Sequence, residues 1–236
     1  MLLDLLGAIA LTSASAVVVG TLAWSLPWPS RDRARAAIVL FLWFAIVAAL
    51  GATGALTATG AGPIGVGIAV ALPLVVFAVA LLHPRLLAPA VASIPLQRLV
   101  AIHAVRILGA FFVLLYAAGR LPAPFAPFAG WGDVIVGITA LPVAWLVATR
   151  ARGWRPVTLL WNVFGALDLA DAILLGVTSS PGAPFRLFFG EPDTTIMSGL
   201  PWILIPAYLV PLLALTHVAI FVRLARARPA PLPAHA

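Results

Sequence analysis

Seven polar or ionisable side chains lie within long apolar stretches of this sequence, where they are the groups able to do chemistry. They are His103, Arg106, Asp133, Asn162, Asp168, Asp171 and His217. A charge at the centre of a membrane helix costs about 2.5–3.5 kcal/mol on insertion scales, so such a group usually faces the bundle interior and finds a partner. We therefore take these residues as a candidate cluster that either binds a ligand or ion or joins helices structurally.

Four of these side chains are expected at one depth in the membrane. With a rise of about 1.5 Å per residue, His103 lies roughly 8 Å and Arg106 roughly 12 Å from the basic end of their helix. By the same rise, Asn162 lies roughly 10 Å and His217 roughly 9 Å from the basic ends of theirs. Three helices can therefore bring these groups together.

Arg106 is predicted to pair with Asp168. Asp168 lies roughly 20 Å into its helix, within reach of a long arginine side chain, and Asp171 follows three residues later on a neighbouring face. Buried ion pairs often add little net stability. The pair alone therefore leaves open whether it belongs to a site or only fastens two helices.

Two histidines at matched depth suggest an alternative chemistry. His103 and His217 can be placed on facing helices, an arrangement that ligates the iron of a b-type haem. Arg106 lies near enough to hold a haem propionate. The structural alternative is that both are hydrogen-bonded core residues.

A third chemistry comes from the segment Gly130-Trp131-Gly132-Asp133. It resembles the GxGD element of intramembrane aspartyl proteases, in which two aspartates share a proton and activate water. Asp168 or Asp171 would be the partner. The order departs from that family, because the partner aspartate should precede the GxGD helix, and no Pro-Ala-Leu element follows. The structural alternative is that the carboxylate of Asp133 caps a helix that begins at residue 132.

The composition determines which elements position these groups. Of the 236 residues, 63% are hydrophobic and 9% are charged, whereas soluble domains are about 45–50% apolar and 25% charged. In lipid the backbone polar groups must be satisfied within a segment, so long apolar runs become helices. With neither cysteine nor lysine in the chain, thiolate sites and a Schiff base to retinal are excluded. The arginines follow helix ends rather than forming one basic face, which excludes nucleic acid as a partner.

Seven runs are long enough to cross a bilayer core, which takes about 20 residues. We predict an all-α, seven-helix transmembrane domain over residues 1–228, followed by a disordered tail over 229–236. The expected helices cover about 3–26, 36–58, 64–82, 98–118, 132–149, 156–177 and 200–222.

Arginine placement predicts the orientation, because Lys and Arg concentrate in short cytoplasmic loops. Eleven of the fourteen basic residues fall on one side of the predicted membrane. They are Arg31, Arg33, Arg35, Arg85, Arg98, Arg150, Arg152, Arg155, Arg223, Arg226 and Arg228. The N-terminus is therefore expected outside and the C-terminus in the cytoplasm, in the inner (cytoplasmic) membrane. The longest outer connection, about 178–199, forms either a cap or an ordinary solvated loop.

The last expected helix has a proline every five residues, at Pro201, Pro206 and Pro211. Each proline lacks an N–H and frees the carbonyl four residues back, so Trp202 and Ala207 are predicted to offer unpaired oxygens unless water or a neighbouring group pairs with them. Interrupted helices of this kind line substrate sites in transporters, although many membrane prolines are only kinks.

Three segments carry a family resemblance: YAAGRLPAPFAPFAGWGDVIVG (116–137), WNVFGALDL (161–169) and LPWILIPAYLVPLLALTH (200–217). They resemble a group of bacterial multi-pass inner-membrane proteins with no assigned activity. The resemblance implies no cofactor, catalytic residue or metal site. We expect a non-enzymatic membrane protein whose polar interior handles a small molecule or ion, or docks a membrane partner subunit; the haem carrier and the aspartyl protease are the alternatives.

Overall fold

The computed structural model describes residues 1–57, 59–82 and 88–226, and over these residues the protein is a bundle of helices without strands. Seven helical segments are long and apolar enough to cross a membrane, which confirms the predicted fold class. Five are single helices: α1 (Leu2–Ser25), α2 (Ser30–Ala52), α3 (Gly62–Leu82), α7 (Phe125–Thr149) and α8 (Trp154–Thr178). The predicted tail, 229–236, lies outside the described residues, as do Arg85 and Arg228.

The other two spans change their helical form partway. The fourth runs through α5 (Leu96–Ala101), the 3₁₀ segment η1 (Ile102–Gly109) and α6 (Ala110–Ala117). The seventh begins with the π-helical segment η3 (Ile205–Leu209) and continues as α9 (Val210–Arg226). A short helix, α4 (Ala88–Ser93), precedes α5, and a 3₁₀ turn, η2 (Thr195–Ser198), lies in the long connection before η3.

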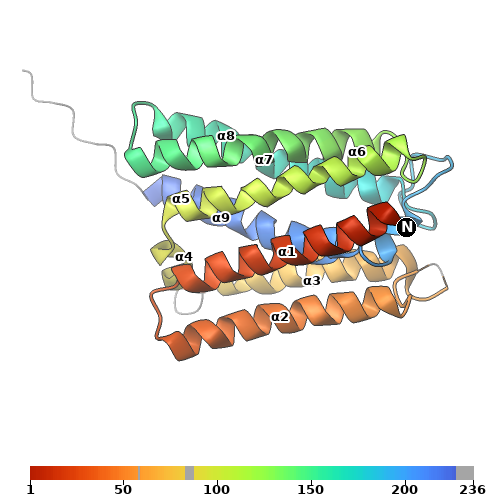
Figure 1. The fold of residues 1–236 in the computed structure, drawn as a ribbon, viewed down its shortest axis with the longest axis horizontal. Coiled ribbons are helices and arrows are strands. Elements are labelled where there is room, and N and C mark those ends of the chain that lie inside the picture. Colours follow the sequence, from red (N-terminus) through yellow and green to blue (C-terminus); the bar gives the residue numbers. More distant parts are fainter. Residues whose placement is uncertain (58, 83–87, 227–236) are drawn as a thin grey trace, which may run out of the picture.

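The last span is the centre of the bundle. Figure 1 shows α1, α2 and α3 on one side and α5 to α8 on the other, with α9 between the two groups. In an apolar 18-residue stretch of the seventh span 67% of the residues are buried, against 11–44% in the matching stretches of the other spans. The large side chains of Tyr208, on this span, and of Trp202, just before it, are fully buried. Polar groups on this span therefore lie far from lipid.

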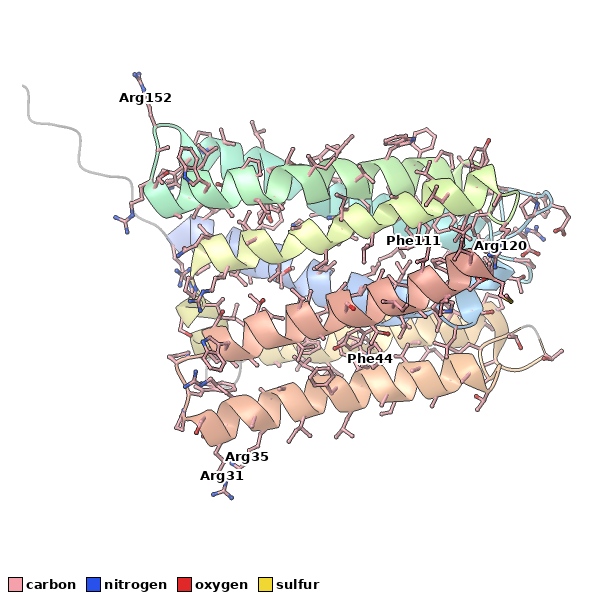
Figure 2. All side chains as sticks on the ribbon, viewed as in Figure 1. Arg31, Arg35, Phe44, Phe111, Arg120 and Arg152 are labelled. Carbon is pink, nitrogen blue, oxygen red and sulfur yellow. The ribbon has the colours of Figure 1, made fainter. Side chains whose placement is uncertain are left out.

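The two ends of the bundle differ in charge. The start of α1 and the last turn of α9 lie at opposite ends. Figure 2 shows Arg31, Arg35 and Arg152 at one end and Arg120 at the other. Leucine, isoleucine and valine side chains cover the outer faces of the helices between these ends and are exposed in the isolated bundle, as expected for surfaces that face lipid.

Helix α7 begins earlier than the sequence predicts. It starts at Phe125, whereas the expected helix begins at residue 132. Pro127 is tolerated there because the first turn of a helix has no intrahelical partner for its N–H groups. As a result, Asp133 lies in the third turn of α7 and is buried. The predicted capping role of Asp133 is therefore wrong.

Candidate functional site

Arg106 is the centre of a buried polar network, and its side chain is 1% exposed. Its Nε donates to Asp133 Oδ1 at 2.5 Å, and its Nη2 forms an ion pair with Asp168 Oδ2. Its Nη1 donates to the carbonyl oxygen of Gly165 at 2.9 Å and to His217 Nε2 at 3.0 Å. The ion pair predicted between Arg106 and Asp168 is present, and Asp133 is a second acidic partner.

The 3₁₀ segment η1 positions Arg106 beside α7. Runs of 3₁₀ helix beyond three or four residues are uncommon, and within a longer helix they often mark a functional hinge; η1 has 8 residues. It packs along α7 so closely that a Cβ on Gly137 would fall on the backbone nitrogen of Ile107. A glycine at this position is what allows Arg106 to come so near Asp133 on α7.

Two further glycines make room for the network itself. A Cβ on Gly132 would fall on the carboxylate of Asp168. A Cβ on Gly165 would lie 2.7 Å from His217 Cε1 and 3.2 Å from Arg106 Nη1. Neither position accepts a larger side chain without moving these polar groups, so the glycines are part of the site although they carry no chemistry.

His217 is held in one tautomer by its neighbours. An arginine can only donate, so His217 Nε2 accepts from Arg106 and the ring proton is on Nδ1. That Nδ1 then donates to Asn162 Oδ1 at 2.7 Å, while Asn162 Nδ2 donates to the backbone oxygen of His217 at 3.1 Å. His217 is therefore neutral and fixed by both partners.

His103 lies beside this network and belongs to a separate hydrogen bond. The hydroxyl of Thr216 donates to the Leu213 carbonyl, so at the other contact His103 Nε2 donates to Thr216 Oγ1 at 2.9 Å. The buried Nδ1 of His103 has no hydrogen-bond partner in the described part of the chain. A proton there would be a buried donor without an acceptor, so His103 is neutral as well.

The two histidines do not fit a haem. Their ring centroids are 4.1 Å apart, and the rings are in direct contact. A haem ligated by two histidines has its porphyrin between the imidazoles. The Nε2 atoms of His103 and His217 are instead engaged by Thr216 and Arg106.

The aspartates do not form a protease dyad either. Such a dyad needs two carboxyl groups that share one proton. Here the guanidinium of Arg106 pairs with Asp133 on one side and with Asp168 on the other.

Asp171 is not drawn into the Arg106 network. It lies half-buried on α8 and, with Asp168, lines a surface groove of about 510 Å³ between α7 and α8. The rest of that groove is apolar, with three aromatic side chains that include the exposed Phe128 and Trp131. The predicted cluster therefore separates into the buried Arg106 network, His103 with its own hydrogen bond to Thr216, and Asp171 at the edge.

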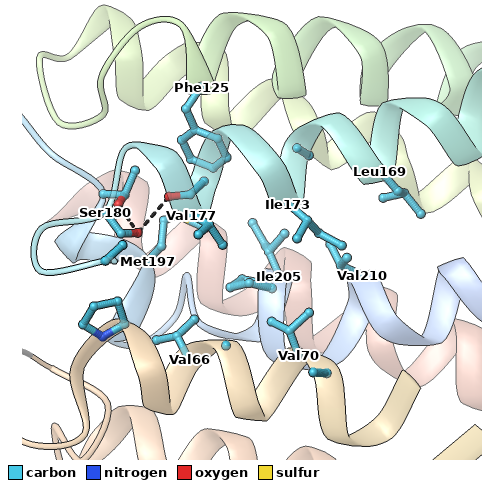
Figure 3. A pocket seen from close by; sticks show the side chains of 18 of the residues that line it. Val66, Val70, Phe125, Leu169, Ile173, Val177, Ser180, Met197, Ile205 and Val210 are labelled. Atoms are coloured by element: carbon cyan, nitrogen blue, oxygen red, sulfur yellow. Dashed lines mark hydrogen bonds between the residues drawn. The ribbon is translucent and has the colours of Figure 1, made fainter. Parts of the chain in front are cut away.

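A cavity of about 350 Å³ adjoins the network on its other side. Figure 3 shows Val66 and Val70 of α3 facing Ile173 and Val177 of α8 across it. The connection over residues 178–199 contributes to one end, where hydroxyl groups of the chain hydrogen-bond to each other. Asp133 is one of the lining residues, and its side chain keeps 12% exposure. The cavity and the charged network thus meet at Asp133.

A second polar contact joins the ends of three spans and was not anticipated from the sequence. Arg120 donates to both carboxylate oxygens of Asp4, at 2.7 and 3.1 Å, and Trp202 Nε1 donates to Asp4 Oδ1 at 3.0 Å. The available signal was an aspartate in the first turn of an apolar helix together with the isolated Arg120 on the same side of the membrane. The side chains of Arg120 and Asp4 are about one-third exposed, in keeping with a position near the interface.

The prolines of the seventh span change its helical form, but they do not leave the carbonyl oxygen of Trp202 unpaired. The carbonyl oxygen of Trp202 accepts from Ile205 N at 3.0 Å, so a neighbouring backbone group pairs with the oxygen that Pro206 frees. The chain turns more tightly just before η3, and this three-residue bond replaces the one that Pro206 cannot make. The consequence is a π-helical segment at Ile205–Leu209.

The fold and the site define an all-helical, seven-span bundle of membrane type with a buried arginine–aspartate network. A family model described as a domain of unknown function (DUF8737) matches residues 63–225, from the start of α3 almost to the end of α9, and the chain belongs to that family. No curated protein and no solved structure matches the chain. The membership agrees with the resemblance to proteins without assigned activity, while a bacterial source and an inner-membrane location stay predictions.

Proposed function

We propose that the chain is a non-enzymatic membrane protein that binds a small molecule or ion inside the bilayer and passes it across, in the manner of a transporter. The observation that carries this proposal is the meeting of the Arg106 network with the cavity at Asp133. A cavity of about 350 Å³ is within the range of small-ligand sites, which are about 300–1,000 Å³ with a few placed polar groups.

The form of the two spans around the site supports movement of a ligand. Arg106 lies in the 3₁₀ segment of one span, and the π-helical segment of the other borders the cavity through Ile205 and Pro206. Segments of 3₁₀ and π-helix within longer helices recur at functional hinges and sites, and discontinuous helices form the midplane sites of many transporters. A purely structural ion pair requires neither interruption.

We also propose that the basic end of the bundle is cytoplasmic, which places the N-terminus outside. The end that carries Arg31, Arg35 and Arg152 would then follow the positive-inside rule. In this orientation the cavity and the connection over 178–199 lie toward the outer side, and a ligand would enter from there.

The absence of cysteine from the chain makes access to the cavity directly measurable. Ala172 lines the cavity, whereas Ala170, on the same helix, is exposed and lies outside it. We would compare Ala172→Cys with the matched control Ala170→Cys. Each variant would be treated with a membrane-impermeant methanethiosulfonate reagent in right-side-out and in inside-out vesicles.

Reagents of this kind react with the thiolate, which forms only where water reaches the sulfur. We expect the cysteine at position 172 to react from both sides of the membrane and the cysteine at position 170 to react from neither. If position 172 is as unreactive as position 170 in both vesicle preparations, the cavity is sealed. The Arg106 network is then a scaffold or a docking element for a partner subunit, and the transport proposal is refuted.

A further inference from the structure

The buried network is one positive charge short. Asp133 and Asp168 each pair with Arg106, and both neighbouring histidines are neutral in their hydrogen-bonding arrangement. An uncompensated carboxylate inside a bundle is costly, so it gains a proton or a cationic partner. The net negative charge of the site therefore favours a proton or a cationic ligand.

The excess charge has access to the cavity through Asp133. The side chain of Arg106 is 1% exposed and that of Asp133 is 12% exposed, so the carboxylate is the charged group that a ligand in the cavity meets. Arg106 lies behind it and is occupied by four hydrogen bonds. An anionic ligand would have to displace these bonds to reach the guanidinium.

The remaining walls supply too few oxygen ligands to coordinate a metal ion directly. Hard cations such as Ca²⁺ take 6–8 oxygen ligands, whereas the other polar side chains among the lining residues are the hydroxyls of Ser180 and Thr194. These hydroxyls hydrogen-bond to each other at 2.8 Å. Within the described part of the chain, no three His, Asp or Glu side chains are grouped as a metal site would need.

Two aromatic rings favour an organic cation instead. Phe112 and Phe125 both line the cavity, with ring centroids 5.3 Å apart and an edge-to-face orientation. Phe112 lies about one turn from Asp133, since a Cβ on Gly130 would contact it, and Phe125 is two turns before Asp133 on α7, farther along the cavity. Cations within about 6 Å of a ring face are attracted by its quadrupole, which is the means by which aromatic sites recognise quaternary ammonium groups.

We propose that this cavity binds a hydrophobic organic cation of single charge, with its charged group against Asp133 and its apolar body between α3 and α8. The inference rests on the proposed function, because it names the ligand class for the same site. Apolar walls remove water from the body of such a ligand and leave the carboxylate as its counter-ion. An apolar anion would lack the favourable counter-ion, and a small inorganic cation would lack the apolar contact.

The test uses two probes of the same shape and opposite charge, tetraphenylphosphonium and tetraphenylborate. The purified protein would be placed in phosphatidylcholine nanodiscs, and its unfolding midpoint followed by the fluorescence of its eight tryptophans. A ligand that binds only the folded state raises the unfolding midpoint, and at a given concentration a tighter ligand raises it further. We expect tetraphenylphosphonium to raise the midpoint and tetraphenylborate to leave it unchanged.

Variants then test whether tetraphenylphosphonium binds in the cavity. Gly67 lines the cavity with open space around its Cβ position, so Gly67→Phe fills the cavity without touching the network. Gly20 has equally open space but lies on α1 outside the cavity, and Gly20→Phe is the matched control. We expect Gly67→Phe and Asp133→Asn each to weaken tetraphenylphosphonium binding by about tenfold or more, and Gly20→Phe to bind as the wild type does.

Three results would overturn the inference: no effect of tetraphenylphosphonium on the wild type, an equal effect of tetraphenylborate, or full binding by Gly67→Phe. The first would mean that a proton supplies the missing charge. If Asp133→Asn fails to fold, tetraphenylborate still tests whether the site prefers a cation, and Gly67→Phe still tests whether the probe binds in the cavity. Thiol access at position 172 without phosphonium binding would leave transport standing and reject the ligand class. Phosphonium binding without thiol access at position 172 would support the ligand class and reject transport.

Discussion

Replacing Arg106 with methionine tests whether charge holds the centre of the bundle together. The variant keeps a long side chain but removes ion pairs to Asp133 and Asp168, together with the hydrogen bonds to the Gly165 carbonyl and to His217. Removing one partner of a buried ion pair costs about 3–5 kcal/mol, mainly because an unpaired charge stays buried. We expect a loss of at least this size, because two carboxylates lose their partner.

This loss of stability should largely disappear when the two carboxylates that lose their partner are neutralised as well. In the variant Arg106→Met/Asp133→Asn/Asp168→Asn, no charge remains unpaired, and replacing a complete buried ion pair by neutral groups is often close to neutral in stability. We therefore expect the triple variant to recover most of the stability that the single variant loses. Arg152→Met is the control, because Arg152 is exposed at the end of the bundle and surface substitutions usually change stability by about 0.5 kcal/mol or less.

Reversible unfolding in mixed micelles with increasing dodecyl sulfate, followed by circular dichroism, would give the free energies of unfolding. The reasoning would be refuted by a loss below about 1 kcal/mol for Arg106→Met, which is far under the range for a broken buried pair. It would also be refuted by a triple variant that is as unstable as the single one. In that case packing or hydrogen bonding, and not unpaired charge, determines the stability of the centre.

Two further predictions concern packing and orientation. Gly165→Ala should lower the free energy of unfolding by about 1–3 kcal/mol through overpacking, because its Cβ would lie 2.7 Å from His217 Cε1. Gly176→Ala on the same helix should lower it less, since its Cβ would meet a ring atom of Phe125 at an ordinary 3.5 Å. Equal losses for the two variants in the micelle titration would argue against the close contact. Fluorescent-protein and alkaline-phosphatase fusions to the C-terminus should report a cytoplasmic end, and phosphatase activity there would reverse the proposed orientation.

The apolar runs carried most of what the sequence predicts correctly, and the orientation inferred from arginine placement stays a prediction. Lipid forces each long apolar run into a helix, so the number of spans and the fold class follow from local composition. Depth along a helix depends only on its rise per residue, which is why the Arg106–Asp168 pair could be predicted. The same arithmetic placed Asn162 and His217 at the depth of Arg106, and the two residues join its network.

The sequence placed Asp133 wrongly because its helix starts earlier than the run of apolar residues suggests. A proline near the start of a segment indicates a helix boundary in many contexts, yet in the first turn it costs no hydrogen bond. Moving the start to Phe125 turns a predicted cap into a buried partner of Arg106. The contact between Asp4 and Arg120 was missed for a different reason, since residues 116 positions apart carry no local signal of their proximity.

By itself, then, the sequence determines that this chain forms seven helices long and apolar enough to cross a membrane. It also determines that they carry a few costly polar groups at similar depths, because the cost of burying backbone and charge in lipid is local to each segment. Which groups touch was decided only by the tertiary structure. Helix rotation and close approach at glycines such as Gly132, Gly137 and Gly165 depend on how neighbouring helices pack, and one segment contains no information about the surface of another. The cavity beside Asp133 has the same origin, since it is the space that α3, α8 and the seventh span leave between them.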